Sequence, residues 1–117
     1  MTKREEVTNY CKSFPEVYED YPFHDNNWAL MRLKNNKKCF AFIYEKEESI
    51  WINVKCDYEW IQLWRDTYSG VIPAYHMNKK YWNTIILNGT VPELEIKRMI
   101  AESYDMVSKK NIGSKKC

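Results

Sequence analysis

The chain has 117 residues and contains little glycine or proline, with 3 glycines and 4 prolines. This scarcity argues against flexible linkers, collagen-like repeats and glycine-rich phosphate loops. No apolar run approaches the length of a membrane span, and residues 1–6 lack the pattern of a signal peptide. We therefore expect no membrane partner and a cytoplasmic location.

Motifs for catalysis and metal binding are also missing. The chain has 2 histidines, His24 and His76, and it contains no H-E-x-x-H, G-x-x-x-x-G-K or G-x-G-x-x-G pattern. The adjacent carboxylates, such as Glu47 and Glu48, are typical of solvated turns and helix starts. The sequence predicts a protein that is not an enzyme and holds no cofactor or metal, and an enzyme ranks third among the alternatives.

Cysteine is present but shows no paired spacing. The 4 cysteines are Cys11, Cys39, Cys56 and Cys117, and no C-x-x-C motif occurs. Without an export signal, such cysteines are most simply reduced thiols. We expect the first three to be buried as small apolar residues.

Positive charge is concentrated at the end of the chain. The net charge is +2, but four of the 18 basic residues lie in segment 109–117, which has no acid. The first 108 residues therefore carry 14 basic against 16 acidic side chains. A domain dedicated to duplex DNA is normally far more basic, so the folded body is not expected to bind phosphates strongly.

Aromatic residues are unusually abundant, with 5 Trp, 9 Tyr and 4 Phe. A single small domain can bury much area with these rings, but some of them must remain at the surface. We expect residues 1–110 to form one monomeric domain and residues 111–117 to be a disordered tail.

Helical periodicity occurs in three places. The apolar stripes predict a first helix over residues 3–13 and a third from Thr90 to about Lys109. The second predicted helix has Asp57 as its N-cap and ends at Gly70, which is expected to be a left-handed C-cap. Capping boxes are predicted from Thr2 to Glu5 and from Thr90 to Glu93. We expect the last two helices to pack on one face of a sheet and to bury four side chains: Trp60, Trp64, Ile100 and Tyr104.

Five segments favour β-structure, namely residues 28–34, 39–44, 50–55, 71–77 and 81–87. Residues 15–27 read as a connection. In the second segment Phe40, Phe42 and Tyr44 are expected to share one face, and in the third Ile50, Ile52 and Val54 form a buried face. The order α-βββ-α-ββ-α indicates a single-domain α+β fold, an antiparallel sheet with helices on one face.

One cationic and aromatic constellation stands out as a binding candidate. Residues 75–82 combine His76, Asn78, Lys79 and Lys80 with three rings, including Trp82. Lysines in a turn can reach phosphates, while neighbouring rings can stack on bases. Two further basic sites are the turn with Lys37 and Lys38, and the strand end at Lys55. Alternatively, these lysines only solvate turns and the rings pack in the sheet.

The chain resembles the MmcQ/YjbR family of small bacterial proteins over about residues 4–108. The motifs that carry the resemblance are Tyr21-Pro22-Phe23, Lys38-Cys39-Phe40-Ala41, Val54-Lys55-Cys56-Asp57, residues 70–82 and Ser103-Tyr104. Residues 70–82 are the most specific part.

The resemblance implies a CyaY-like, frataxin-type fold and DNA binding through a double-wing arrangement of hairpins. The positions that match the family are Lys38, Lys55, His76, Asn78, Lys79 and Trp82, whereas Tyr81 stands where the family often has His. The acidic ridge of frataxins is reduced here to Glu5 and Glu6 in the first helix, so no iron site is carried over.

Two functions remain open. In the first, a non-enzymatic domain binds DNA through Lys37, Lys38, Lys55, Lys79 and Lys80, with His76 or Trp82 positioning or stacking the bases. In the second, exposed aromatic residues on the sheet bind another protein and nucleic acid plays no role. Salt separates the two, because phosphate contacts weaken steeply with ionic strength while an aromatic interface barely responds.

Overall fold

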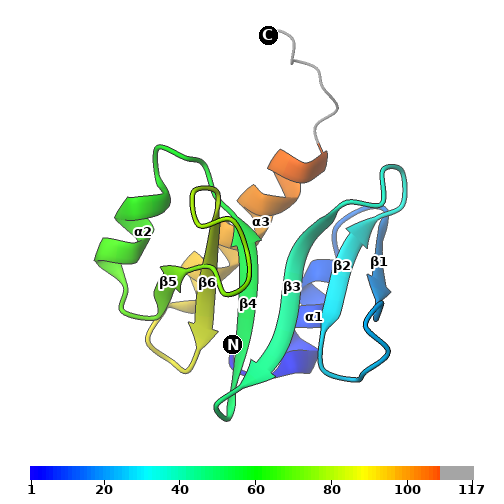
Figure 1. Ribbon diagram of the computed structural model, residues 1–117, viewed down its shortest axis with the longest axis horizontal. Coiled ribbons are helices and arrows are strands. Elements are labelled where there is room, and N and C mark those ends of the chain that lie inside the picture. The colour runs from blue at the N-terminus through cyan, green and yellow to red at the C-terminus, as the bar shows by residue number, and fades with distance from the viewer. Residues whose placement is uncertain (109–117) are drawn as a thin grey trace, which may run out of the picture.

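The computed structural model describes residues 1–108. Its elements in chain order are α1 (Arg4–Lys12), β1 (Val17–Asp20), β2 (Ala29–Leu33), β3 (Cys39–Lys46), β4 (Ser49–Lys55), α2 (Ile61–Thr67), β5 (Val71–Pro73), β6 (Trp82–Leu87) and α3 (Glu93–Ser108). The strands form one 6-stranded antiparallel sheet in the order β1-β2-β3-β4-β6-β5. Figure 1 shows α1 and α3 behind this sheet and α2 beside β5. The predicted α+β class is confirmed, while the expected tail, residues 111–117, lies outside the described residues.

One face of the sheet forms the apolar core with the helices. Ile52, Val54 and Ile85 project from β4 and β6 and are fully buried. All three helices contribute to the same cluster, for example through Val7 of α1 and Ile61 of α2. The alternation in β4 therefore places its isoleucines and valine as predicted. Ile100 is buried as well, whereas Trp64 and Tyr104 are only half-buried.

The connection expected at residues 15–27 contains a strand that sequence periodicity does not reveal. β1 has 4 residues, all half-buried, and pairs with β2 from Val17–Leu33 to Asp20–Leu30. Its short mixed sequence has no strong β pattern, so pairing along the β2 edge determines its conformation. The observed order is therefore α-ββββ-α-ββ-α.

A β-bulge moves Phe40 to the helix side of the sheet. Met31 pairs with Ala41 and Arg32 pairs with Cys39, so Phe40 has no partner in the register. Phe40 belongs to the helix-side core, where its ring lies 5.3 Å from Tyr104. The expectation that Phe40 shares a face with Phe42 and Tyr44 is wrong, because an extra residue reverses the alternation.

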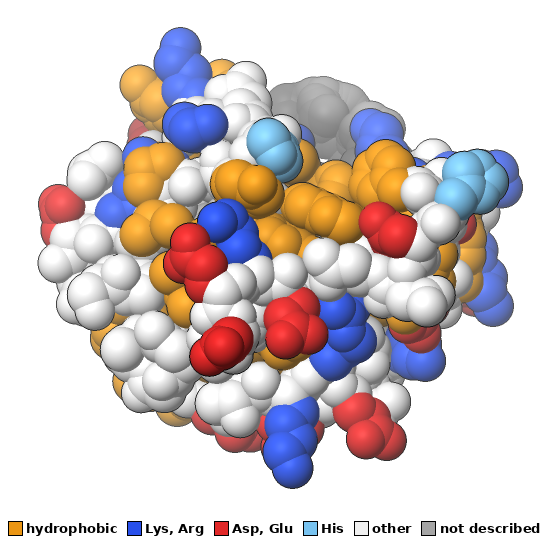
Figure 2. Space-filling view, turned by 60° about the horizontal axis from the view of Figure 1, so that its bottom comes forward, with side chains coloured by type: hydrophobic (Ala, Val, Ile, Leu, Met, Phe, Trp, Pro, Cys, Tyr) orange, Lys and Arg blue, Asp and Glu red, His pale blue; other side chains and the backbone are white. Residues whose placement is uncertain are grey.

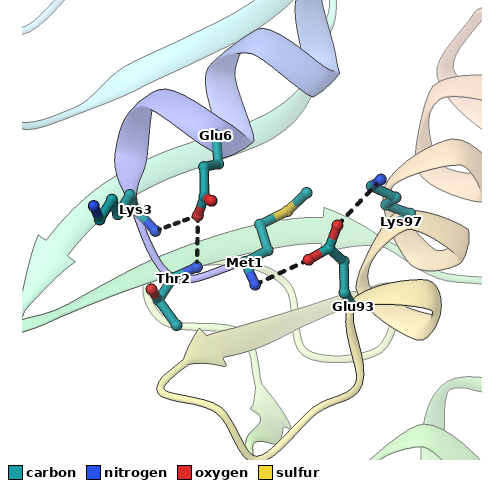
Figure 3. Close-up of polar contacts among 6 residues, drawn as sticks. All are labelled: Met1, Thr2, Lys3, Glu6, Glu93 and Lys97. Carbon is teal, nitrogen blue, oxygen red and sulfur yellow. Dashed lines mark hydrogen bonds and ion pairs between the residues drawn. The ribbon is translucent and has the colours of Figure 1, made fainter.

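The start of α1 is capped by Glu6 and not by the predicted Glu5. The Glu6 carboxylate accepts hydrogen bonds from the backbone N–H groups of Thr2 and Lys3, at 3.0 and 3.1 Å (Figure 3). These two bonds hold the pKa of Glu6 below its usual value. Because α1 begins at Arg4, the residue that can reach back to its N-cap is Glu6.

The capping box predicted at Thr90 and Glu93 does not form. The Thr90 hydroxyl donates to Asn88 instead, at 2.8 Å. Glu93 lies between the amino group of Met1 and the Lys97 ammonium, each 3.2 Å away (Figure 3). These two cations lower the pKa of the Glu93 carboxyl, and they join the N-terminal segment to the first turn of α3.

α2 begins later than the sequence predicts. Asp57 accepts the backbone N–H of Glu59 at 2.8 Å and so caps a preceding turn, while Trp60 is the N-cap of the helix. Trp60 is 54% exposed, so its predicted burial is wrong. The neighbouring Ile61 is buried instead, so the inward stripe of α2 is offset by one residue from the predicted one.

Gly70 is required for a close approach and not for a left-handed cap. Among the described glycines, Gly89 has a positive φ, 94°, and Gly70 does not. A Cβ on Gly70 would collide with the Thr90 hydroxyl, and the Gly70 carbonyl accepts the Ile86 N–H at 2.8 Å. The strand expected over residues 71–77 ends at Pro73, where a proline suits the sheet edge.

Candidate functional site

The face of the sheet opposite the helices is partly covered by residues 74–81, which we call the crossing loop. In Figure 1 this loop passes in front of β4 and β6. Asn53 and Thr84, both fully buried, attach its start to the sheet. Asn53 Nδ2 donates to the Tyr75 carbonyl at 2.9 Å, and the Tyr75 N–H donates to Thr84 Oγ1 at 2.9 Å. The backbone N–H and carbonyl of Tyr75 are therefore satisfied by side chains of the sheet, because no strand within residues 1–108 pairs with this residue.

Tyr44 completes this network from β3. Its hydroxyl donates to Asn53 Oδ1 at 2.9 Å, and the Thr84 hydroxyl donates to the same oxygen at 2.6 Å. Burial raises the pKa of Tyr44 to about 12. The phenol is therefore neutral at physiological pH and acts as a hydrogen-bond donor.

The far end of the crossing loop is held by Arg65 of α2. Its guanidinium donates to the Lys79 carbonyl and, at 2.6 Å, to Asn83 Oδ1. Asn78, a predicted site residue, accepts the Lys80 N–H at 2.9 Å through its side-chain oxygen. Asn78 thus shapes the turn that presents Lys79 and Lys80, and its role as a DNA contact remains a prediction.

Lys55 and Trp82, at the end of β4 and the start of β6, are direct partners in the sheet register. The Cys56 N–H donates to the Tyr81 carbonyl at 2.8 Å, which extends the pairing beyond the strands. Exposed Tyr58 and Tyr81 then lie with ring centroids 6.1 Å apart. We call this group the lysine edge, and its members are Lys55, Tyr58, Lys79, Lys80 and Tyr81.

The remaining predicted residues are spread more widely. Lys37 and Lys38 are exposed on the turn before β3, at the same end of the sheet as Lys55 because neighbouring strands are antiparallel. Trp82 is half-buried and meets Phe42 edge-on at 5.6 Å. His76 lies elsewhere, against Tyr75 with ring centroids 4.0 Å apart.

The charges of the predicted lysines are unneutralised within the described residues. Ion pairs involve Lys12, Arg32, Lys46, Lys97 and Arg98, but none of the predicted lysines. Asp57 and Glu59 are exposed in the segment beside the lysine edge, so the positive surface is interrupted. The arrangement can contact a few phosphates and does not form a broad duplex-binding surface.

A second feature of this side of the sheet was not predicted. Phe23, Trp28, Tyr44 and Tyr75 border a cleft of about 420 Å³, together with polar residues at its rim. Figure 2 shows the corresponding band of hydrophobic side chains between the two histidines, with acidic side chains below it. The aromatic count signalled surface rings, but no spacing in the sequence could indicate that residues 23–28 face the crossing loop.

The three described cysteines are free thiols. Cys11 and Cys56 are buried as predicted, while Cys39 is half-buried. Burial raises the pKa of Cys11, and it raises the pKa of Cys39 and of Cys56 to about 12. Because the thiolate is the reactive form, these thiols are poor nucleophiles near neutral pH.

Residues 1–108 contain no cluster of three or more His, Cys, Asp or Glu that could hold a metal ion. None of the helices in this part of the chain is long and apolar enough to cross a membrane.

The chain is similar to several bacterial proteins. It is 32% identical over 117 residues to the uncharacterized protein YyaQ of Bacillus subtilis, covering 91% of this chain and 98% of that protein. It is 29% identical over 99 residues to the uncharacterized protein YjbR of Escherichia coli, covering 85% of this chain and 81% of the relative.

Solved structures share the fold. The Deinococcus radiodurans protein DR2400, a DUF419 domain, superposes with a TM-score of 0.87 at 26% identity and covers 96% of this chain and 83% of that one. A Pseudomonas syringae protein gives a TM-score of 0.79 at 26% identity, with 89% and 97% covered. The YjbR family model matches residues 12–106. The chain therefore belongs to the YjbR family.

Proposed function

We propose that this domain is a non-enzymatic binding module for single-stranded DNA and that the strand contacts the lysine edge. The observation that supports this most is the exposed ring pair Tyr58 and Tyr81, bordered by lysines that have no ion-pair partner among the described residues. Stacking of a base on an aromatic ring contributes about 1–3 kcal/mol. Nearby lysines can neutralise phosphates without reading sequence.

A single strand suits this surface better than a duplex. Stacking on Tyr58 or Tyr81 requires unpaired bases, because the bases of a duplex are already stacked on each other. Residues 1–108 also carry more acidic than basic groups, so long-range attraction is weak. We expect affinity in the nonspecific range, about 10⁻⁴–10⁻⁶ M at physiological salt.

The test is fluorescence anisotropy of the full chain with a labelled oligothymidylate at several salt concentrations. Lys80→Glu should weaken binding and reduce the salt slope by about 0.7, the value for one phosphate contact on a single strand. Lys3→Glu is the matched control, because Lys3 is also exposed and has no ion-pair partner in residues 1–108. Both variants change the net charge equally and retain the lysines of segment 109–117.

The rings provide a second arm of the test. Tyr58→Ala and Tyr81→Ala should each cost about 1–3 kcal/mol of binding, whereas Leu94→Ala, 73% exposed on α3, should cost nothing. Equal binding by Lys80→Glu and Lys3→Glu would exclude the lysine edge. No binding at low salt would favour a protein-interaction domain, for which exposed Trp60, the N-cap of α2, and exposed Leu63 on α2 are candidate contacts.

A further inference from the structure

The aromatic cleft is built as a stack of rings, of which Tyr44 lies on β3 and the others lie on the adjoining loops. Trp28 lies on Tyr44 with ring centroids 4.0 Å apart and planes 13° from parallel. Tyr75 is near-parallel to Trp28, at 15° and 6.4 Å. Phe23, 57% exposed, meets Trp28 edge-on at 6.1 Å. The cleft thus offers flat apolar surfaces, and its volume of about 420 Å³ lies within the usual range of small-molecule sites.

Both walls of the cleft are fixed in place before any ligand arrives. The side chain of Asn27 accepts the Glu45 N–H at 2.7 Å and an Arg4 N–H at 2.9 Å, which ties the Trp28 wall to β3 and α1. The opposite wall is fixed by the hydrogen bonds of Tyr75 to Asn53 and Thr84. A preformed site loses less conformational entropy when it binds.

The backbone beside each wall adopts an uncommon conformation. His24, next to Phe23, has φ of 59°, and His76, next to Tyr75, has φ of 62°. Left-handed backbone is infrequent in residues other than glycine, and it often occurs at binding sites. The two segments that face each other across the cleft therefore share the same kind of strain.

The rim of the cleft is rich in free hydrogen-bond acceptors. Asp25 Oδ1 accepts the N–H groups of Asn27 and Trp28, both at 3.0 Å. Its other oxygen, and both carboxylate oxygens of Glu45, accept no hydrogen bond from residues 1–108. A ligand that donates hydrogen bonds at its edge would satisfy these acceptors.

Charge restricts the ligand further. Lys46, which also lines the cleft, has its Nζ 5.1 Å from the ring centroid of Tyr75, so a cation already occupies one face of this ring and would repel another. Asp25 and Glu45 in turn repel an anion that enters the cleft. A neutral ligand avoids both penalties.

We propose that the cleft binds one neutral planar heterocycle with an exocyclic amino group, the chemistry of adenine and cytosine. Its ring stacks against Trp28, and its amino group donates to Asp25 or Glu45. This inference goes beyond DNA binding at the lysine edge, because the cleft recognises the base without a phosphate. The heterocycle comes either from a free nucleoside or from an unpaired base of a strand.

The experiment is an NMR titration of the full chain with nucleosides, following the indole and backbone N–H signals around the cleft. Adenosine should bind about 10-fold more tightly than inosine, and cytidine more tightly than uridine, since a hydrogen bond to a charged group contributes about 1.5 kcal/mol or more. Binding should not change with salt or with Lys80→Glu. The proposal would be overturned if amino and oxo nucleosides bind equally or if no nucleoside binds. It would also be overturned if the NMR signals that shift lie outside the cleft.

Two variants locate the site without disturbing the fold. Asp25→Asn keeps an oxygen for the two backbone N–H groups but removes the charge, and it should abolish most of the preference for adenosine over inosine. Phe23→Ala removes an exposed ring and should weaken all nucleosides, whereas Leu94→Ala on α3 should not. Unchanged preference in Asp25→Asn and unchanged affinity in Phe23→Ala would contradict this location.

Oligonucleotides distinguish the two sources of the heterocycle. If a base of the strand enters the cleft, oligodeoxycytidylate should bind more tightly than oligothymidylate, and Asp25→Asn should remove the difference. If the ligand is a free nucleoside, the two oligonucleotides should bind equally while cytidine still binds. If nucleosides bind but oligonucleotides do not, only the proposal for the lysine edge is rejected. If oligonucleotides bind but nucleosides do not, only the proposal for the cleft is rejected.

Discussion

The two faces of the sheet are stabilised by different physics. The helix-covered face contains aliphatic side chains such as Ile52, Ile85 and Ile100, which are fully buried. The opposite face is built from aromatic rings and from the polar network of Tyr44, Asn53 and Thr84. Aliphatic burial is nondirectional and tolerates small shifts, whereas hydrogen bonds require a fixed geometry. The first face therefore stabilises the domain, and the second positions a loop and a cleft.

Truncation of a core residue should separate the two faces most clearly. Ile100→Ala removes a fully buried side chain of α3 and should lower the free energy of unfolding by about 2–5 kcal/mol. Phe23→Ala removes a larger side chain that is 57% exposed beside the cleft, and it should change stability by no more than about 0.5 kcal/mol. Urea unfolding of both variants gives the comparison, and equal losses would contradict it.

Alkaline pH should destabilise the face opposite the helices. Burial raises the pKa of Tyr44 to about 12, above the value of about 10 in the unfolded chain. The folded state favours the neutral phenol, and this preference adds to the free energy of unfolding. The added stability is complete below about pH 10 and is lost as the pH rises towards 12. The loss is on the order of 3 kcal/mol for two pKa units.

The measurement for Tyr44 is urea unfolding of wild type and Tyr44→Phe across the alkaline range. Cysteine thiols titrate in both proteins, so the difference between the two curves reports on Tyr44. The stability of Tyr44→Phe should fall less steeply between about pH 10 and pH 12. Parallel curves would show that Tyr44 ionises normally in the folded protein.

Removal of the Thr84 hydroxyl should have a smaller effect. Thr84→Val preserves shape but leaves the Tyr75 N–H without its acceptor, which should cost about 1–3 kcal/mol of stability. Thr67→Val, an exposed change in α2, is the matched control and should be close to neutral. Hydrogen exchange at the Tyr75 amide should accelerate in Thr84→Val alone, and unchanged exchange would contradict the proposed attachment of the crossing loop.

Metal removal should have no effect on either face. Residues 1–108 offer no group of three or more potential ligands, so EDTA should leave Tm unchanged. Thermal unfolding with and without the chelator tests this expectation. A lower Tm that one equivalent of metal restores would disprove it.

The helix-covered face was the more predictable of the two. Ile50, Ile52 and Val54 alternate in β4, and Ile96 and Ile100 recur at helical spacing in α3, so both patterns identify the buried side directly. The errors occurred where one residue changes the pattern. The bulge at Phe40 reverses the alternation, and α2 buries Ile61 instead of the neighbouring Trp60.

The candidate site was only partly predictable. The sequence singled out Lys79 and Lys80 because they adjoin rings, and in the structure the next residue, Tyr81, lies beside Tyr58. It could not show that Phe23 and Trp28 approach Tyr75, which lies about fifty positions along the chain. Such contacts leave no periodic signal, since hydrogen bonds by Asn27, Asn53 and Thr84 set the course of the two loops.

The sequence by itself determined the class of fold, the helix-facing core and the family, because periodic burial and local motifs are written along the chain. The tertiary structure alone decided the strand β1, the side on which Phe40 packs, and the meeting of Phe23–Trp28 with the crossing loop. Edge pairing, a bulge and buried side-chain hydrogen bonds all depend on partners distant in sequence. Their energies exist only once the sheet has formed.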